Sequence, residues 1–436
     1  MIERLLHQLD ASPVNFYAVR TICQELEKNG YKKIEASSPI GEVKAGDKLF
    51  VTKNDSSVYA FNIGRKPLGD SGFRMICAHC DSPTFRIKPN AEMTCEGGIV
   101  KLNTEVYGGP ILSTWFDRPL TIAGRVIMKG KTALQPRSVL IHVQRPLMQI
   151  SNLAIHFNRQ VNDGVKLSRQ KDMLPILGII NSELEYGNML MNIICEEVEK
   201  EIGAGRTITP DEILDFDLYL ADATPACTFG AHNELISSGR LDDLSMCFAG
   251  LDALLASGEN NATKVLAIFD NEETGSQTKQ GAGSPFLATM LKRIAFAQSG
   301  TEESFFQAVE KSFMVSADNA HAWHPNYPEK YDATNHPVLG GGPVIKINAA
   351  QKYASDAVSS SVFSELCREA DVPCQKFVNH SDVAGGSTLG NILASSIPLR
   401  GVDMGNGVLA MHSCRETASV DDHLNCIKVF THFFES

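Results

Sequence analysis

The segment VLAIFDNEETGS, at positions 265–276, is an apolar run that ends in two adjacent glutamates and a glycine. Successive side chains of a strand point to opposite faces, so Glu272 and Glu273 can perform different tasks. One carboxylate can bind a metal ion while its neighbour moves a proton, as metal-assisted hydrolysis requires. A solvated turn after a buried strand would contain the same pair without any chemistry, so other segments must decide between the two interpretations.

Four further segments contain acids, and three of them also contain histidine at short spacing. They are AHCDSP (78–83), GRLDDLS (239–245), SADNAHAWHPNY (316–327) and LAMHSCRE (409–416). Imidazole and carboxylate ligands suit zinc, and manganese or cobalt could replace it. Two ions about 3.5–4 Å apart would need a bridging carboxylate. The sequence contains no HExxH motif, which excludes a zinc site of the helix-borne type.

The elements that must position these residues are short strands alternating with helices. The segments 73–82, 264–273 and 312–321 each start as an apolar run and end in acids or histidine. Helical periodicity is present at 242–257 and 284–298. This alternation predicts an α/β fold with a mainly parallel sheet flanked by helices. Ligands bind at the carboxyl ends of such strands, so we expect the polar clusters to share one site.

The middle of the chain has a different sequence pattern, with short segments typical of strands, many turn residues and few helical patterns. It predicts an inserted β-rich domain at 88–229, within a discontinuous α/β domain formed by 1–87 and 230–436.

Composition narrows the classes of partner. The chain has 436 residues, of which 43 % are hydrophobic, and a formal net charge of −11 with scattered lysines and arginines. Nucleic-acid binding needs a basic surface, so we expect no nucleic-acid partner. We find no secretion signal and no apolar stretch long enough for a bilayer, so we expect no membrane association. The odd number of cysteines, 11, favours reduced thiols in a cytoplasmic protein.

Eight segments, in order along nearly the whole chain, resemble the aspartyl aminopeptidases, which are cytosolic dinuclear zinc metallopeptidases. They are AHCDSP, RPLMQISNLAIHFNR, GRLDDLSMCFAGLDAL, FDNEETGS, SADNAHAWHPNYPEKY, GPVIKINAAQKYAS, GGSTLGNILAS and DMGNGVLAMHSCRE. The resemblance implies two Zn²⁺ ions per subunit and peptide substrates. It also implies homo-oligomers, in which dimers joined through the inserted domain assemble into a dodecamer.

The resemblance also implies a set of metal ligands. His79 and Asp318 would hold one zinc, Glu273 and His412 would hold the other, and Asp242 would bridge both. The resemblance favours Asp242 over the adjacent Asp243 as the bridge.

Two further carboxylates receive catalytic roles by the same resemblance. Glu272 would be the general base, and Asp81 would lie behind His79, where it fixes the tautomer of the ring.

Substrate contacts follow from the same resemblance. Lys346 and Tyr353 match positions that hold the side-chain carboxylate of an acidic N-terminal residue, although a strand lysine with its head in solvent is the structural alternative. Gly385 and Gly386 match a glycine-rich wall beside the substrate, and His321 lies close enough in sequence to Asp318 to line the site.

His156 matches a histidine that reaches the active site of a neighbouring subunit, where it helps to bind substrate or stabilise the transition state.

The predicted function is therefore the removal of N-terminal Asp or Glu from peptides. A neutral aminopeptidase that removes Leu or Ala is the main alternative, and a deacylase or dipeptidase could use the same two-metal chemistry. A non-catalytic assembly protein is disfavoured because the base and all five metal positions are present.

Overall fold

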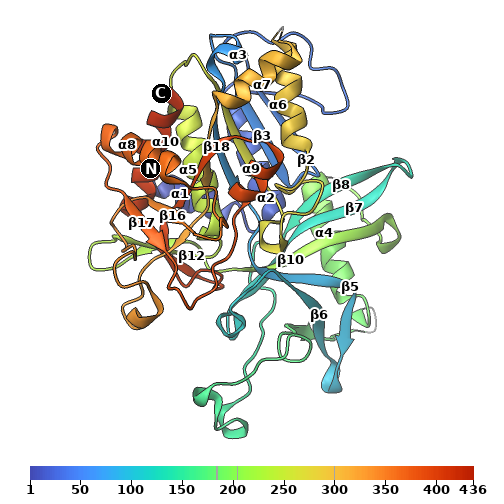
Figure 1. Ribbon diagram of the computed structural model, residues 1–436. Coiled ribbons are helices and arrows are strands. Elements are labelled where there is room, and N and C mark those ends of the chain that lie inside the picture. The colour runs from blue at the N-terminus through green and yellow to red at the C-terminus, as the bar shows by residue number, and fades with distance from the viewer. Residues whose placement is uncertain (183–184, 204, 299) are drawn as a thin grey trace. The chain divides into compact units, whose positions relative to one another are not determined.

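The structure is a computed structural model that describes residues 1–436 except 183–184, 204 and 299. It is a mixed α/β fold with large sheets flanked by helices, as predicted (Figure 1). The contacts divide the chain into two compact units. The α/β unit comprises Met1–Asp81, Ala226–Met411 and Glu416–Ser436, and the β-rich unit comprises Ser82–Pro225 and His412–Arg415.

A nine-stranded sheet forms the centre of the α/β unit, in the order β1-β2-β3-β13-β4-β14-β18-β16-β17. The strands are β1 (Lys32–Lys33), β2 (Lys48–Lys53), β3 (Ser57–Asn62), β13 (Thr263–Phe269), β4 (Phe73–His79), β14 (Phe313–Ala317), β18 (Arg400–Gly405), β16 (Val344–Ile347) and β17 (Gln375–Val378). The four central strands β13, β4, β14 and β18 are parallel, whereas β3 and β16 pair antiparallel with their inner neighbours. The sheet is therefore mainly parallel, as predicted.

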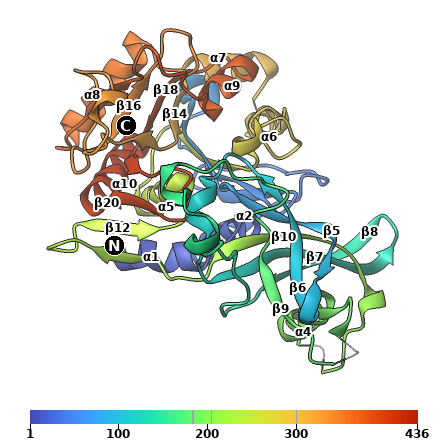
Figure 2. The same ribbon diagram turned by 90° about the horizontal axis from the view of Figure 1, so that it is seen from below.

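Helices cover both faces of this sheet (Figures 1 and 2). One core contains side chains of α1 (Ile2–Asp10), α2 (Asn15–Lys28), α5 (Leu241–Ala256), α8 (Ala357–Glu369) and α10 (Val420–Glu435). The other contains side chains of α3 (Leu68–Ser71), α6 (Phe286–Ala297), α7 (Glu302–Glu310) and α9 (Leu389–Ser396). Adjacent residues of β14 show the alternation, since Val315 joins the first core and Met314 the second.

A second, five-stranded sheet completes the α/β unit, in the order β11-β12-β20-β19-β15. Its strands are β11 (Cys227–Phe229), β12 (Leu235–Ser238), β20 (Glu416–Ser419), β19 (Gly407–Leu409) and β15 (Ala320–His321). This sheet was not predicted from the sequence, because strands of two to four residues carry too little periodicity to be recognised.

The β-rich unit is an antiparallel six-stranded sheet in the order β8-β7-β10-β5-β6-β9, packed against one helix, α4 (Met189–Ile202). Its strands are β5 (Thr84–Thr94), β6 (Ile99–Tyr107), β7 (Leu120–Thr132), β8 (Gln135–His142), β9 (Ile176–Ile179) and β10 (Ile213–Asp222). The short segment His412–Arg415 also belongs to this unit by its contacts, although it lies far away in sequence.

Short 3₁₀ helices occupy several connections. They are η1 (Glu96–Gly98), η2 (Leu112–Trp115), η3 (Ile155–Phe157), η4 (Val161–Asp163), η6 (Pro210–Glu212), η7 (Glu272–Thr274) and η8 (Pro328–Lys330). Among the described residues, none of the helices combines the length and the apolar composition needed to cross a lipid bilayer.

Helix α5 lies close to the sheet because it has a glycine at the contact. A Cβ atom at Gly250 would stand 2.8 Å from Cδ1 of Leu266 and 3.2 Å from Cγ2 of Ile76. A side chain at this position would therefore push the helix away from β13 and β4. The close packing matters because the first turn of α5 carries Asp242 and Asp243.

Candidate metal centre

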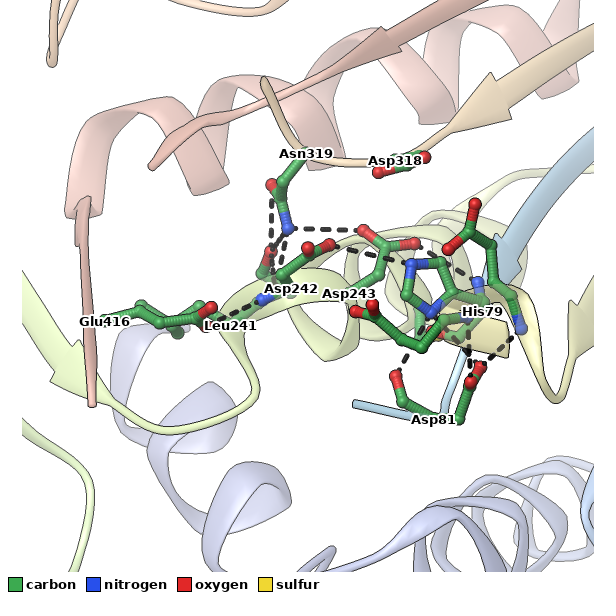
Figure 3. A network of polar contacts seen from close by, with 12 residues as sticks. His79, Asp81, Leu241, Asp242, Asp243, Asp318, Asn319 and Glu416 are labelled. Carbon is green, nitrogen blue, oxygen red and sulfur yellow. Dashed lines mark hydrogen bonds and ion pairs between the residues drawn. The ribbon is translucent and has the colours of Figure 1, made fainter. Parts of the chain in front are cut away.

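The predicted ligands of the α/β unit lie at one edge of the central sheet. His79 is the last residue of β4, Glu273 follows β13 in η7, and Asp318 directly follows β14. These strands are adjacent and parallel, so their carboxyl ends meet at that edge. The first turn of α5 adds Asp242 to the same place, and Figure 3 shows its side chain beside that of His79.

Two overlapping groups of side chains could each hold a metal ion. The ligand atoms of His79, Asp242 and Glu273 all lie within 4.8 Å of one another, and so do those of Asp242, Asp243 and Asp318. Asp242 is common to both groups. An imidazole and several buried carboxylates are a donor set that suits zinc, and a bound cation offsets the repulsion between the acids. The residues of this site therefore fit a zinc ion.

Asp81 organises both sides of this cluster. The Nδ1 atom of His79 lies 3.1 Å from the carbonyl oxygen of Asp81 and 3.4 Å from its Oδ1, while Nε2 lies 3.6 Å from Oδ1 of Asp242. The carboxylate of Asp81 also accepts hydrogen bonds from the backbone N–H groups of Glu272 and Glu273, each at 3.1 Å. One residue thus orients the histidine and the pair of glutamates.

The pKa values of His79 and Glu272 are both raised, but for different physical reasons. Burial opposes the charged form of His79, but hydrogen bonds to Asp242 and Asp81 raise its pKa well above the usual value. Burial, together with the nearby Asp318 and Glu273, raises the pKa of Glu272 to about 8 although His79 acts in the opposite direction. Glu272 is therefore a carboxyl group that can exchange a proton near neutral pH.

The side chain of Asp243 points to backbone and amide donors. Its Oδ2 accepts the backbone N–H of His79 at 3.2 Å, and its Oδ1 accepts a hydrogen bond from Nδ2 of Asn319, also at 3.2 Å (Figure 3). The peptide bond between Asp242 and Asp243 is cis. The two carboxylates thus have different surroundings despite their adjacency in sequence.

Two residues that the sequence patterns did not reveal support the first turn of α5. Asn319 donates from Nδ2 to the carbonyl oxygen of Leu241 at 2.8 Å, and Glu416 accepts the backbone N–H of Asp242 at 3.0 Å (Figure 3). Both belong to segments that were already recognised, SADNAH and LAMHSCRE. The available signals were the adjacency of Asn319 to Asp318 and the place of Glu416 at the end of the LAMHSCRE segment.

Lys346 lies inside the cluster and not in solvent. Its side chain is 3 % exposed, and its Nζ lies 3.4 Å from Oδ2 of Asp318 and donates to the carbonyl oxygen of Asn319 at 3.2 Å. The same ammonium lies 5.4 Å from the centre of the ring of Tyr353, which is also buried. Burial opposes the charge of Lys346, but Asp318 raises its pKa, so the ammonium stays charged.

The remaining predicted residues of the α/β unit lie in less buried segments. His321 is exposed in β15, with its ring edge-on to Phe377 at 6.0 Å between centres. A Cβ atom at Gly385 would stand 2.8 Å from Oδ1 of Asn379, whereas Gly386 faces open space. The structure therefore does not draw His321 into the buried cluster.

His412 and His156 belong to the β-rich unit and are described within it. His412 has a positive φ of 69°, and its Nδ1 lies 3.1 Å from the carbonyl oxygen of Gly109. That contact orients the ring of His412 and leaves Nε2 as the nitrogen that can bind a metal ion. His156 is exposed in η3.

Comparison with known proteins establishes the class. A family profile described as "Aminopeptidase I zinc metalloprotease (M18)" matches residues 8–434, so this chain belongs to the M18 family and is a zinc-dependent aminopeptidase. A relative in Clostridium novyi described as "Probable M18 family aminopeptidase 2" is 50 % identical over 432 residues, covering 99 % of this chain and 98 % of the relative.

Solved structures of the same architecture support this assignment. Ape4, in the cryo-EM structure of its complex with Nbr1, superposes with a TM-score of 0.94 at 37 % identity, covering 99 % of this chain and 85 % of that chain. The mApe1 dodecamer of S. cerevisiae gives a TM-score of 0.84 at 26 % identity, with 99 % and 95 % coverage.

The contacts of Asp81 lead to a first prediction. Replacing Asp81 by alanine keeps the backbone carbonyl beside Nδ1 of His79 but removes the carboxylate beside that nitrogen, which also accepts two N–H groups, so zinc affinity should fall about 10- to 100-fold. Competition with a chelating indicator measures this affinity. Asp70→Ala, which changes an exposed aspartate, is the control and should bind zinc like the parent. Equal affinity of Asp81→Ala and the control would contradict the role of Asp81.

Proposed function

We propose that the protein is a two-zinc aminopeptidase that releases N-terminal residues, preferably Asp or Glu, from peptides. The observation that carries the two-ion proposal is the membership of Asp242 in both groups of candidate ligands. One carboxylate that serves two sites is the arrangement that a dinuclear centre needs. In this proposal the domain predicted at 1–87 and 230–436, which includes His412, carries the chemistry, and the β-rich segment predicted at 88–229 joins subunits.

The proposed ligands and their division between the two ions follow the resemblance to the aspartyl aminopeptidases, whereas the grouping by distance places Glu273 with His79. His79 and Asp318 would hold one ion, Glu273 and His412 the other, and Asp242 both. When bound, zinc supplies Lewis acidity, which polarises the scissile carbonyl and lowers the pKa of water; manganese or cobalt could supply the same chemistry.

Glu272 performs the proton transfers in this proposal. Its carboxylate accepts a proton from the attacking water and delivers it to the amine of the leaving peptide. Asp81 holds the backbone of η7 and thereby keeps Glu272 in position for both steps.

The division of labour between the glutamates and Asp242 is testable. Glu272→Gln should retain the zinc content of the parent but lose about 10²- to 10⁴-fold in kcat, because only the base is removed. Asp242→Asn should lose both zinc and activity. Elemental analysis and peptide turnover measure the two quantities, and Glu310→Gln, at an exposed end of α7, serves as the control. Loss of zinc in Glu272→Gln would show that Glu272 is a ligand.

Lys346 supports the preference for acidic N-terminal residues. An ammonium group has three N–H donors, and its contacts with Asn319 and Asp318 account for two of them. A substrate carboxylate near the third N–H donor would meet an ammonium group that is fixed in place and already buried. Binding would then require no further desolvation of Lys346. Tyr353, Gly385, Gly386 and His321 would form the surroundings of the substrate in this proposal.

Paired substrates with N-terminal Asp and Leu, otherwise identical, test the preference on zinc-loaded protein. We expect a higher kcat/KM for Asp, and Lys346→Met should reduce the Asp-to-Leu ratio by about tenfold or more, since a charged hydrogen bond is lost. Lys376→Met, an exposed lysine on the neighbouring strand β17, is the matched control.

The zinc content of Lys346→Met must be measured in parallel, because Lys346 also contacts Asp318. Preference of the parent for Leu would instead support the neutral aminopeptidase. Preference for a blocked N-terminus would support the deacylase alternative.

We further propose a homo-oligomer built from dimers, as a dodecamer, in which His156 completes the site of a neighbouring subunit. The related mApe1 of S. cerevisiae forms a dodecamer. Around His156 three apolar side chains are strongly exposed: Leu153 at 60 %, Ile155 at 50 % and Phe157 at 80 %. Such a patch is typical of a surface that another chain covers. The free cysteines agree with a reducing, cytoplasmic setting.

His156→Ala tests the shared site. The variant should lose activity by a factor on the order of 10², as expected for one donor that stabilises the transition state, while its oligomer remains intact. Light scattering after size-exclusion chromatography reports the oligomer, and His232→Ala, at an exposed position of the α/β unit, is the control. Parental activity in His156→Ala would remove this histidine from the active site.

A further inference from the structure

Asp403 is a fully buried carboxylate to which the mechanism above assigns no role. It lies in β18, directly beside Ser316 of the parallel strand β14. It opens the segment DMGNG at 403–407. Burial of a carboxylate is costly unless its oxygens are hydrogen-bonded, so the partners of Asp403 indicate why the fold keeps it there.

Those partners come from two separate segments that carry proposed substrate-binding residues. Oδ1 of Asp403 accepts a hydrogen bond from the hydroxyl group of Thr388 at 2.7 Å, and Oδ2 accepts one from the backbone N–H of Ala354. Ala354 directly follows Tyr353. Thr388 lies two residues after Gly386 and precedes the first residue of α9.

A second set of contacts strengthens the connection to the Tyr353 segment. The backbone N–H of Asp403 donates to Oγ of Ser355 at 2.9 Å, and that hydroxyl donates to the carbonyl oxygen of Asp403 at 3.3 Å. Residues 354 and 355 thus form hydrogen bonds with both the side chain and the backbone of Asp403.

Helix α9 closes over this carboxylate at a glycine. A Cβ atom at Gly390 would stand 2.5 and 2.6 Å from the two carboxylate oxygens of Asp403 and 2.7 Å from Oγ of Ser316. Only a residue without a side chain lets the helix approach this closely. The position of the Gly385–Gly386 segment, which leads into α9, therefore depends on the same carboxylate.

We propose that Asp403 is a positioning residue that sets the shape of the substrate pocket by joining the Tyr353 segment and the Gly385–Gly386 segment to β18. The inference rests on the proposed assignment of these two segments to the pocket. Asp403 does not touch the substrate in this arrangement. Asp403 would act on the substrate indirectly, by setting the distance between the Tyr353 segment and the Gly385–Gly386 segment. Its loss should therefore change KM and selectivity more than kcat, which depends on the proton transfers.

The sharpest test removes one hydrogen bond to the carboxylate while leaving Asp403 itself in place. Thr388→Val replaces the hydroxyl by a methyl group of equal size, whereas Thr388→Ser keeps the hydroxyl. On zinc-loaded full-length enzyme, Thr388→Val should raise KM about tenfold, change the ratio of kcat/KM between Asp and Glu substrates at least about threefold, and leave kcat within about threefold. Thr388→Ser should stay within about twofold of the parent.

Thr301→Val is the matched control for a purely structural effect. Thr301 precedes α7 as Thr388 precedes α9, and its hydroxyl accepts the backbone N–H of Ser304. No proposed site residue lies on α7. This variant should lower the melting temperature by loss of the cap but leave KM and selectivity unchanged. Zinc content is measured for every variant.

The outcomes separate the hypotheses. Equal KM and selectivity for Thr388→Val and Thr388→Ser would overturn the role of Asp403, and so would a lower melting temperature without a change in KM. Asp403→Ala should exceed the effect of Thr388→Val, and if that variant fails to fold the threonine pair still decides. If the parent prefers Leu, the proposed acidic preference fails, while the comparison of the threonine variants on a Leu substrate still tests Asp403.

Discussion

Mutual repulsion between buried carboxylates is the constraint on which the centre of the α/β unit depends. Asp81, Asp242, Asp243 and Asp318 are all buried at one edge of the sheet. Isolated, each would cost several kcal/mol or take up a proton. The structure offsets this with directed donors: the imidazole of His79, the ammonium of Lys346, the amide of Asn319 and backbone N–H groups. A zinc ion held by the proposed ligands would complete the compensation.

This electrostatic problem explains why the surrounding packing is tight. Hydrogen bonds to buried charges act only over short distances, so the strands and helices that carry them cannot shift. Gly250 brings α5 close to the sheet, and Gly390 brings α9 close to Asp403. Gly250 lies in the middle of α5 against Leu266 and Ile76, whereas Gly390 is the second residue of α9. Close packing of helices on the sheet thus accompanies both the proposed metal ligands at the end of β4 and the Tyr353 and Gly385–Gly386 segments beside β18.

Much of the fold was predictable, because fully buried parallel strands are apolar runs that end in polar residues. Every residue of β13 is buried, and its sequence shows this before the glutamates begin. The antiparallel pairing of β16 with β18 and the small five-stranded sheet were not predictable in the same way. Short strands pair with segments that are distant in sequence, and the local periodicity of a strand does not indicate which segment it will pair with. Membership of residues 412–415 in the β-rich unit is a further long-range effect.

The sequence by itself determined the kind of chemistry: histidines and acids at the ends of apolar runs, two adjacent glutamates, and a resemblance that covers nearly the whole chain. Only the tertiary structure decided which donor meets which acid. It alone turns Lys346 toward Asp318 and lets Asp81 hold both His79 and the N–H groups of Glu272 and Glu273. It alone buries Asp403 between Thr388 and Ala354. The reason is physical: ligand type is a property of single residues, whereas compensation of buried charge depends on distances between residues far apart in the chain.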